Sequence, residues 1–157
     1  MNVSQPEPRA SGETDGHDAG SRAGAAEPPR QRTILVVDDE PDMLENVARI
    51  LQRGPYVCLT ASSAQHALAL LDRERLDLIL TDLRMPGIDG LTLIREAKRL
   101  RPTTPIVMVT AYAADSAAQA ALLAGATALL TKPFTAAQLL ETTRKILQDP
   151  DRPKDRP

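Results

Sequence analysis

The sequence has little cysteine and few aromatic residues, and each shortage excludes a class of protein. A single cysteine, Cys58, excludes an intramolecular disulfide framework and a zinc site built from cysteines. Only 2% of the residues are aromatic, namely Tyr56, Tyr112 and Phe134. No apolar run approaches the roughly 18–20 residues of a membrane helix, and the N-terminal residues lack the apolar segment of a signal peptide. We therefore expect a soluble, cytoplasmic protein.

The sequence also lacks an excess of charge of either sign. Lys and Arg number 19 against 21 Asp and Glu, which gives a formal net charge of −2. A protein with this balance has no basic surface for the phosphate backbone of a nucleic acid. We expect no direct DNA binding and no association with a membrane.

Both ends of the chain lack the residues that build a core. Residues 1–31 contain no Leu, Ile, Phe, Trp or Tyr, and residues 148–157 are charged and rich in proline. Segments of this composition bury too little apolar surface to offset the entropy of ordering, so we predict two disordered tails. Residues 32–147 remain, and they suffice for one domain with one core.

Apolar runs and helical patterns alternate along residues 32–147. Glycine and capping residues mark the boundaries: Gly125 ends the fourth helix, and Ser62 with Gln65 and Thr135 with Gln138 form capping-box patterns. Each predicted strand is followed by a helix with apolar residues at helical spacing. The predicted strands are residues 33–37, 56–60, 76–81, 105–109 and 128–130.

Strict alternation predicts an α/β fold, a doubly wound parallel sheet with helices on both faces. The first, third and fourth strands are almost continuously apolar, which suits the centre of a sheet, whereas the second and fifth are weaker, which suits its edges. The expected architecture is a five-stranded, flavodoxin-like (βα)5 fold with strand order 2-1-3-4-5. In such a sheet, the ligand site lies beyond the carboxyl ends of the strands.

Five chemically distinctive side chains follow the predicted strands. Asp38 and Asp39 follow the first strand, Asp82 the third, Thr110 the fourth and Lys132 the fifth. Carboxylates a few ångströms apart raise one another's pKa and oppose folding, so such a cluster needs a cation. Because its ligands are oxygens, without paired His or Cys, we expect Mg²⁺ rather than Zn²⁺.

Four short motifs stand in order at these strand ends. They are Val36-Val37-Asp38-Asp39-Glu40, Asp82-Leu83-Arg84-Met85-Pro86-Gly87, Thr110-Ala111-Tyr112 and Thr131-Lys132-Pro133-Phe134. Together they resemble the receiver domain of bacterial two-component response regulators, of the stand-alone type. The resemblance covers about residues 32–147 and implies a phosphoacceptor signalling protein of a phosphorelay. It implies no enzyme beyond catalysis of its own phosphorylation and dephosphorylation, and we expect no output domain in the chain.

The resemblance also implies which residues carry the chemistry. Asp82 is the phosphoacceptor, modified to 4-aspartylphosphate by the phosphohistidine of a sensor histidine kinase or by acetyl phosphate. Asp38 and Asp39, with Asp82 and the backbone carbonyl of Arg84, hold Mg²⁺, which offsets the repulsion between a carboxylate and a phosphoryl group.

Two further residues of the resemblance act on the phosphoryl group itself. Lys132, aimed by a cis Lys132–Pro133 bond, contacts the phosphoryl oxygens. Thr110 bonds a phosphoryl oxygen only when one is present, which makes its hydroxyl a switch. A downstream partner or phosphotransfer protein would read the switched surface, and a phosphorylation-dependent homodimer is left open.

The sequence departs from the family pattern near this site. Leu129 stands where many receivers have Tyr or Phe, so a switch by an aromatic rotamer is not expected. Arg84 and Tyr112 occupy the positions that flank the phosphoryl group. We expect these two bulky side chains to limit the access of water and to lengthen the phosphorylated lifetime.

The fourth predicted helix, residues 113–124, is also unusual because Asp115 is its only charge. A partner surface on this helix would therefore be apolar, through Leu122 or Leu123. The alternative is that both leucines belong to the core.

Several single residues have simpler explanations. Asp39 also fits an N-cap of the helix that starts at Pro41. Cys58 fits core packing better than a redox role, and His66 fits an exposed side chain on the second helix, remote from the strand ends.

Other functions use similar parts. An Mg-dependent, aspartate-nucleophile phosphohydrolase of the haloacid-dehalogenase kind expects a second aspartate two residues after its nucleophile, where this chain has Arg84 or Glu40. A flavin binder needs a first loop that cradles phosphate, which Asp38-Asp39-Glu40 would repel. A fragment of a longer regulator is also compatible with the sequence.

Overall fold

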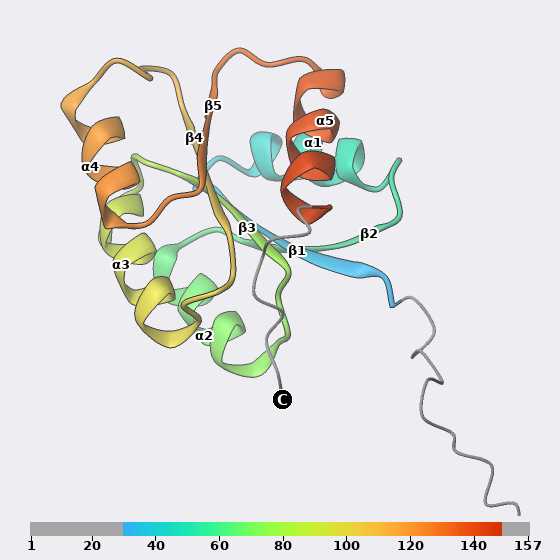
Figure 1. The fold of residues 1–157 in the computed structure, drawn as a ribbon, viewed down its shortest axis with the longest axis horizontal. Helices are drawn as coiled ribbons and strands as arrows, with labels where there is room; N and C mark the ends of the chain where they lie inside the picture. Colours follow the sequence, from blue (N-terminus) through green and yellow to red (C-terminus); the bar gives the residue numbers. More distant parts are fainter. Residues whose placement is uncertain (1–29, 149–157) are drawn as a thin grey trace, which may run out of the picture. The chain divides into compact units, whose positions relative to one another are not determined.

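The computed structural model describes residues 30–148, so the two predicted tails lie almost wholly outside the described residues. Strands and helices alternate strictly within the described range, as predicted (Figure 1). In chain order they are β1 (Arg32–Val37), α1 (Pro41–Leu51), β2 (Tyr56–Ala61), α2 (Ala64–Arg73), β3 (Leu78–Asp82), α3 (Gly90–Leu100), β4 (Ile106–Thr110), α4 (Ser116–Ala124), β5 (Ala128–Thr131) and α5 (Ala136–Leu147).

The five strands form one parallel sheet in the order β2-β1-β3-β4-β5, which confirms the predicted fold class and strand order. The weaker strands, β2 and β5, lie at its two edges as expected. Register pairs Val37 with Thr81 and Thr110 with Thr131, so neighbouring strands end at a common level. Residues that follow different strands are thereby brought to one end of the sheet.

Each face of the sheet is covered by its own layer of helices (Figure 1). Alternate strand residues point to opposite layers, as the pleat of a strand requires. Leu35 and Ile79 belong to the apolar cluster that includes α2, α3 and α4, whereas Ile34 and Leu80 belong to the cluster beneath α1 and α5. Both layers are therefore anchored on the same buried strands.

Helix boundaries follow local chemistry, with two corrections, of which the first is that α4 begins at Ser116, three residues later than predicted. Thr135 and Gln138 form the predicted capping box of α5, and Gly125 ends α4 with a φ of 116°, a conformation that favours glycine. The capping box predicted at Ser62 was wrong, because the neighbouring Ser63 is the N-cap of α2 and accepts a bond from the His66 amide. Two adjacent serines offer equivalent caps, so the local sequence alone does not decide between them.

Strand β3 begins two residues later than predicted and ends one residue later. Before its start, the Asp77 carboxylate accepts a hydrogen bond from the Thr33 amide at 2.8 Å, so a side chain takes the place of a strand carbonyl. Asp82 is consequently the last residue of the strand rather than the first residue after it. This places the Asp82 side chain on a rigid element.

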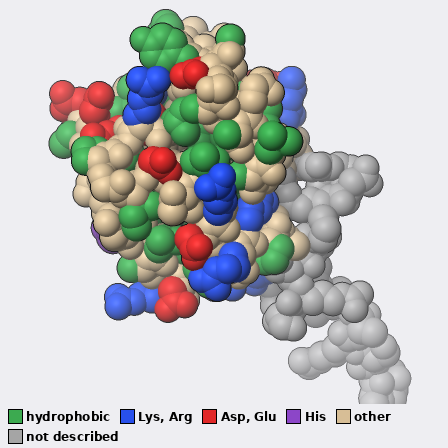
Figure 2. Space-filling model, turned by 90° about the vertical axis from the view of Figure 1, so that its left-hand side faces the viewer, with side chains coloured by type: hydrophobic (Ala, Val, Ile, Leu, Met, Phe, Trp, Pro, Cys, Tyr) green, Lys and Arg blue, Asp and Glu red, His purple; other side chains and the backbone are tan. Residues whose placement is uncertain are grey.

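The surface of α4 differs from a typical amphipathic helix. Ala118 and Ala121 are its fully buried residues, while Leu122 and Leu123 are exposed, Leu123 by 90%. The alternative that both leucines belong to the core is therefore wrong. Figure 2 shows apolar side chains interspersed with charged ones on the face that carries the helices at the left of Figure 1.

The remaining single-residue expectations concern the other helices and β2. His66 is exposed as expected, and Cys58 is half-buried against the apolar cluster of α1 and α5. Across residues 30–148, none of the helices has the length and apolar character needed to cross a membrane.

Candidate functional site

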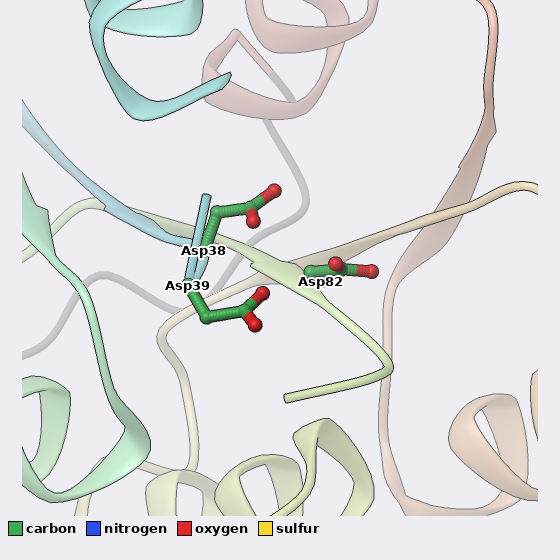
Figure 3. Close-up of side chains that lie close together, drawn as sticks. All are labelled: Asp38, Asp39 and Asp82. Carbon is green, nitrogen blue, oxygen red and sulfur yellow. The ribbon is translucent and has the colours of Figure 1, made fainter. Parts of the chain in front are cut away.

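Three carboxylates meet at the carboxyl end of the sheet. Asp38 and Asp39 follow β1, and Asp82 ends the neighbouring strand β3. One carboxylate oxygen from each lies within 4.8 Å of the others. Figure 3 shows the three side chains projecting from adjacent strand ends in the same general direction. The parallel register thus brings together acids that are far apart in the sequence.

Asp38 is the most buried of the three, with a relative exposure of 3%. Its Oδ1 accepts a hydrogen bond from the Glu40 amide at 2.9 Å, which fixes the carboxylate and turns the chain into α1. Burial, and secondarily the charge of Asp82, raise the pKa of Asp38, while the Glu40 amide and Lys132 act against that rise. Ionised Asp38 is therefore held at an electrostatic cost.

Asp39 does not cap α1. The N-cap of that helix is Glu40, whose side chain makes no capping bond, and Pro41 supplies the first helical residue. A proline at this position removes one N–H that would otherwise need a partner. The side chain of Asp39 instead belongs to the carboxylate cluster.

Lys132 forms ion pairs with two acids of the cluster. Its Nζ lies 3.6 Å from Oδ2 of Asp38 and 3.6 Å from Oδ2 of Asp82. Its backbone N–H donates to the Thr110 carbonyl, and the following peptide bond, Lys132–Pro133, is cis, as the resemblance implied. One ammonium group therefore serves two carboxylates, and the cluster keeps an excess of negative charge.

Thr110 ends β4 and is buried, with an exposure of 4%. Its Oγ1 accepts a hydrogen bond from the Tyr112 amide at 3.2 Å. The hydroxyl is thus tied to the loop that leads into α4, and its own proton remains available to another acceptor.

Arg84 pairs with an acid outside the carboxylate cluster. Its Nη2 lies 3.3 Å from Oδ2 of Asp115, and its guanidinium stands 5.3 Å from the centre of the Tyr112 ring. The three residues connect the β3–α3 loop with the β4–α4 loop. The ligand role of the Arg84 carbonyl stays a prediction.

The structure adds a residue that the sequence patterns did not single out. Gly90 is the first residue of α3, and a Cβ there would lie 2.3 Å from the Asp82 carbonyl oxygen. Helix α3 therefore packs directly against the backbone of Asp82. The sequence signal for this close approach is a glycine directly after the N-cap residue Asp89, at a helix position where other residues are usually preferred.

The donor set of this site fits a hard divalent cation. Among residues 30–148, the three aspartates form the group whose ligand atoms converge, and all are carboxylate oxygens. Such a cation would stabilise the ionised form of Asp38 against the burial and, secondarily, the Asp82 charge that raise its pKa. A zinc site would require nitrogen or sulfur ligands, which this cluster lacks.

Known proteins share both the sequence and the fold. A response regulator receiver protein of Anaeromyxobacter is 40% identical over 110 residues, covering 70% of this chain and 46% of that protein. The response regulator PilR of Pseudomonas aeruginosa is 40% identical over 118 residues, covering 75% of this chain and 26% of that protein. The chain thus spans less than half the length of these curated relatives.

Solved structures agree with this similarity. The chemotaxis response regulator CheY4 of Vibrio cholerae superimposes with a TM-score of 0.71 at 30% identity, covering 74% of this chain and 99% of that one. A CheY-like receiver domain protein from Methanospirillum hungatei gives 0.74 at 33% identity, covering 76% and 96%. The response regulator receiver domain pattern matches residues 34–144, and the chain belongs to that family of two-component systems.

Proposed function

We propose that this receiver domain is the Mg-dependent phosphoacceptor of a two-component phosphorelay, with Asp82 as the modified residue. The proposal rests on the position of Asp82. This residue ends a rigid strand, lies close to two further carboxylates, and has its Oδ2 3.6 Å from the Lys132 ammonium. The family match favours this function over the phosphohydrolase and flavin-binding alternatives.

The proposed reaction transfers a phosphoryl group between two side chains. A carboxylate oxygen of Asp82 forms a bond to phosphorus, and the phosphorus–nitrogen bond of the kinase phosphohistidine breaks. The electron pair of that bond returns to the imidazole, which takes a proton from solvent. The products are an aspartyl phosphate and a free histidine.

Residues of this chain supply the electrostatic stabilisation. Asp38, Asp39, Asp82 and the Arg84 carbonyl would hold Mg²⁺, which when bound neutralises the repulsion between the attacking carboxylate and the phosphoryl oxygens. Lys132 already faces Asp82 and would place its ammonium against the transferred group. Positioned charge of this kind is the main source of catalysis in phosphoryl transfer.

Thr110 would report the modification. Its hydroxyl can donate to a phosphoryl oxygen while the unmodified site offers only a carboxylate, and this difference in affinity shifts the conformational equilibrium. Leu129, half-buried in the core beneath α4, replaces the aromatic switch of many relatives. The readout would be a protein contact, by a downstream partner, a phosphotransfer protein or a second copy.

Arg84 and Tyr112 support a further expectation about lifetime. Because Arg84 comes two residues after Asp82 and lies over the Tyr112 ring, the pair would restrict the approach of water to the aspartyl phosphate. We expect the substitutions Arg84→Ala and Tyr112→Ala to accelerate dephosphorylation, and rates equal to wild type would contradict this role.

The direct test of the proposed function is incubation with acetyl phosphate and Mg²⁺, followed by intact-mass measurement. We expect one added phosphoryl group, which is absent in Asp82→Asn and absent when a chelator removes Mg²⁺. The control variant Asp72→Asn makes the same change at an exposed position of α2 and should be phosphorylated like wild type. An unmodified wild-type protein would overturn the proposal.

A further inference from the structure

The start of α4 holds a good capping residue that does not cap. Helices α2, α3 and α5 begin with a side chain that accepts a hydrogen bond from a first-turn amide, supplied by Ser63, Asp89 and Thr135. Asp115 takes the same place in α4, with the extended backbone of an N-cap, and makes no capping bond. Aspartate is among the strongest N-cap residues, so a competing contact must engage its carboxylate.

That competing contact is with Arg84. Its Nη2 lies 3.3 Å from Oδ2 of Asp115, while Oδ1 of Asp115 accepts a long bond of 3.4 Å from the Ser116 hydroxyl. Arg84 comes two residues after Asp82, so the ion pair joins the loop of the acceptor to the start of α4. We call this contact the Arg84–Asp115 latch.

The ion pair of the latch is weak enough to be replaced by a contact with another anion. Its 3.3 Å separation exceeds the roughly 2.7–2.9 Å of a strong charge-assisted hydrogen bond, and the Arg84 side chain is 70% exposed. A surface cavity of about 500 Å³, lined by Arg84 and by Ala117 of α4 among others, leaves the guanidinium room to move. Exposed ion pairs of this kind contribute little to stability, so a stronger anion can replace Asp115.

A phosphoryl group on Asp82 would be that stronger anion. It brings a charge of about −1.5 to −2 and oxygens that a guanidinium can bind in bidentate fashion. We propose that the latch holds in the unmodified protein and that phosphorylation draws Arg84 away, which frees Asp115 to cap α4. The proposal rests on the proposed function, because it requires a phosphoryl group on Asp82.

The β4–α4 loop strengthens the argument because it joins Thr110, the switch residue at the end of β4, to Asp115 of the latch. The Tyr112 ring lies beneath the Arg84 guanidinium, and the Tyr112 amide donates to Oγ1 of Thr110. Movement of Thr110 toward a phosphoryl oxygen and departure of Arg84 would therefore act on the same loop. Both movements would change the N-terminus of α4, where the released Asp115 side chain would accept a hydrogen bond from the first turn.

Hydrogen exchange at the first-turn amides of α4 tests the latch, with beryllofluoride and Mg²⁺ as the phosphoryl analogue. In wild type we expect beryllofluoride to slow exchange at Ala117 by about five-fold, the usual effect of an N-cap, whereas the Ala118 amide already donates to the Asp115 carbonyl and serves as the reference. In Asp115→Asn, which caps but cannot attract Arg84 by charge, exchange should already be slow without the analogue. In Asp115→Ala, which does neither, exchange should stay fast with and without it.

A matched control breaks an ion pair elsewhere. Glu96→Gln removes the exposed Glu96–Arg99 pair of α3 and should leave the response of α4 like wild type. If wild type binds beryllofluoride but exchange at α4 does not change, or if Asp115→Asn and Asp115→Ala behave alike, the latch is wrong and the proposed function stands. If wild type binds no beryllofluoride, the proposed function fails and the latch fails with it.

Discussion

Strand β3 contains two opposite environments within five residues. Leu78, Ile79 and Leu80 are almost completely buried between the two helix layers, where they pack against other apolar side chains. Asp82, at the end of the same strand, faces two other carboxylates and shares one ammonium with Asp38. The strand interior stabilises the fold, whereas the strand end holds charges that oppose it.

This difference shows how the domain separates stability from chemistry. The buried strands supply enough apolar burial to hold like charges close together, and those charges are what make the strand end suited to a cation and an anionic group. Substitutions in the interior should therefore change stability alone, and substitutions at the end should change chemistry, sometimes with a gain in stability.

The largest effect on stability is expected in the interior. Leu80→Ala removes a fully buried side chain and should lower the free energy of unfolding by about 2–5 kcal/mol. The matched change Leu123→Ala, on the exposed surface of α4, should alter it by less than about 0.5 kcal/mol. Urea unfolding measures both. Equal losses would contradict the assignment of the core.

Gly90→Ala probes the boundary between the two environments. The added Cβ would meet the Asp82 carbonyl oxygen at 2.3 Å and the Leu83 Cα at 2.9 Å, both backbone atoms that cannot rotate away. We expect a loss of about 1–3 kcal/mol in stability together with slower phosphorylation, because Asp82 must shift. Thr92→Ala, an exposed change in the same turn, is the control. Phosphorylation at the wild-type rate would show that the position of Asp82 does not depend on α3.

Asp38→Asn tests whether the strand end opposes folding. Because the pKa of Asp38 is raised in the fold, the free energy of unfolding of the metal-free protein falls as the pH rises through that pKa. The variant lacks this titration, so its Tm in chelator at neutral pH should exceed that of wild type by a few degrees. Mg²⁺ should raise the Tm of wild type and have little effect on the variant. A lower Tm for the variant in chelator would mean that the hydrogen bond from the Glu40 amide and the Lys132 charge outweigh the burial and repulsion of the Asp38 charge.

Substitution of Cys58 should have the smallest effect on phosphorylation. Burial alone raises the pKa of its thiol, and no charge of the carboxylate cluster contributes. Burial raises the pKa of its thiol from 9.0 to about 11, so the thiol stays protonated near pH 8 and should react slowly with iodoacetamide in the folded protein. Denatured protein should react at the ordinary rate. Cys58→Ala should leave phosphorylation unchanged, and rapid alkylation of the folded protein would contradict the burial of this side chain.

Local patterns sufficed for most of the fold. The alternation of strands and helices, the edge positions of β2 and β5, and the capping box at Thr135 all depend on residues close together in the sequence. The convergence of Asp38 with Asp82 also followed, because parallel strands end at one edge. The roles assigned to these residues remain proposals.

Contacts that depend on packing between elements could not be read from local patterns. The Arg84–Asp115 latch joins two loops, and the approach of Gly90 to the Asp82 backbone depends on how α3 lies on the sheet. In α4, alanine on nearly every face leaves the buried side unspecified. The helix turns its small residues inward, as Ala118 shows, and leaves Leu123 in solvent.

The single ammonium between two acids has a consequence for signalling. Lys132 lies 3.6 Å from both Asp38 and Asp82, so its charge is divided and cannot by itself balance the cluster. On the proposed function, the acceptor would react only when a donor and a divalent cation arrive together. The domain would then be phosphorylated only when the phosphoryl donor and the divalent cation are both present, and would not signal when either is missing.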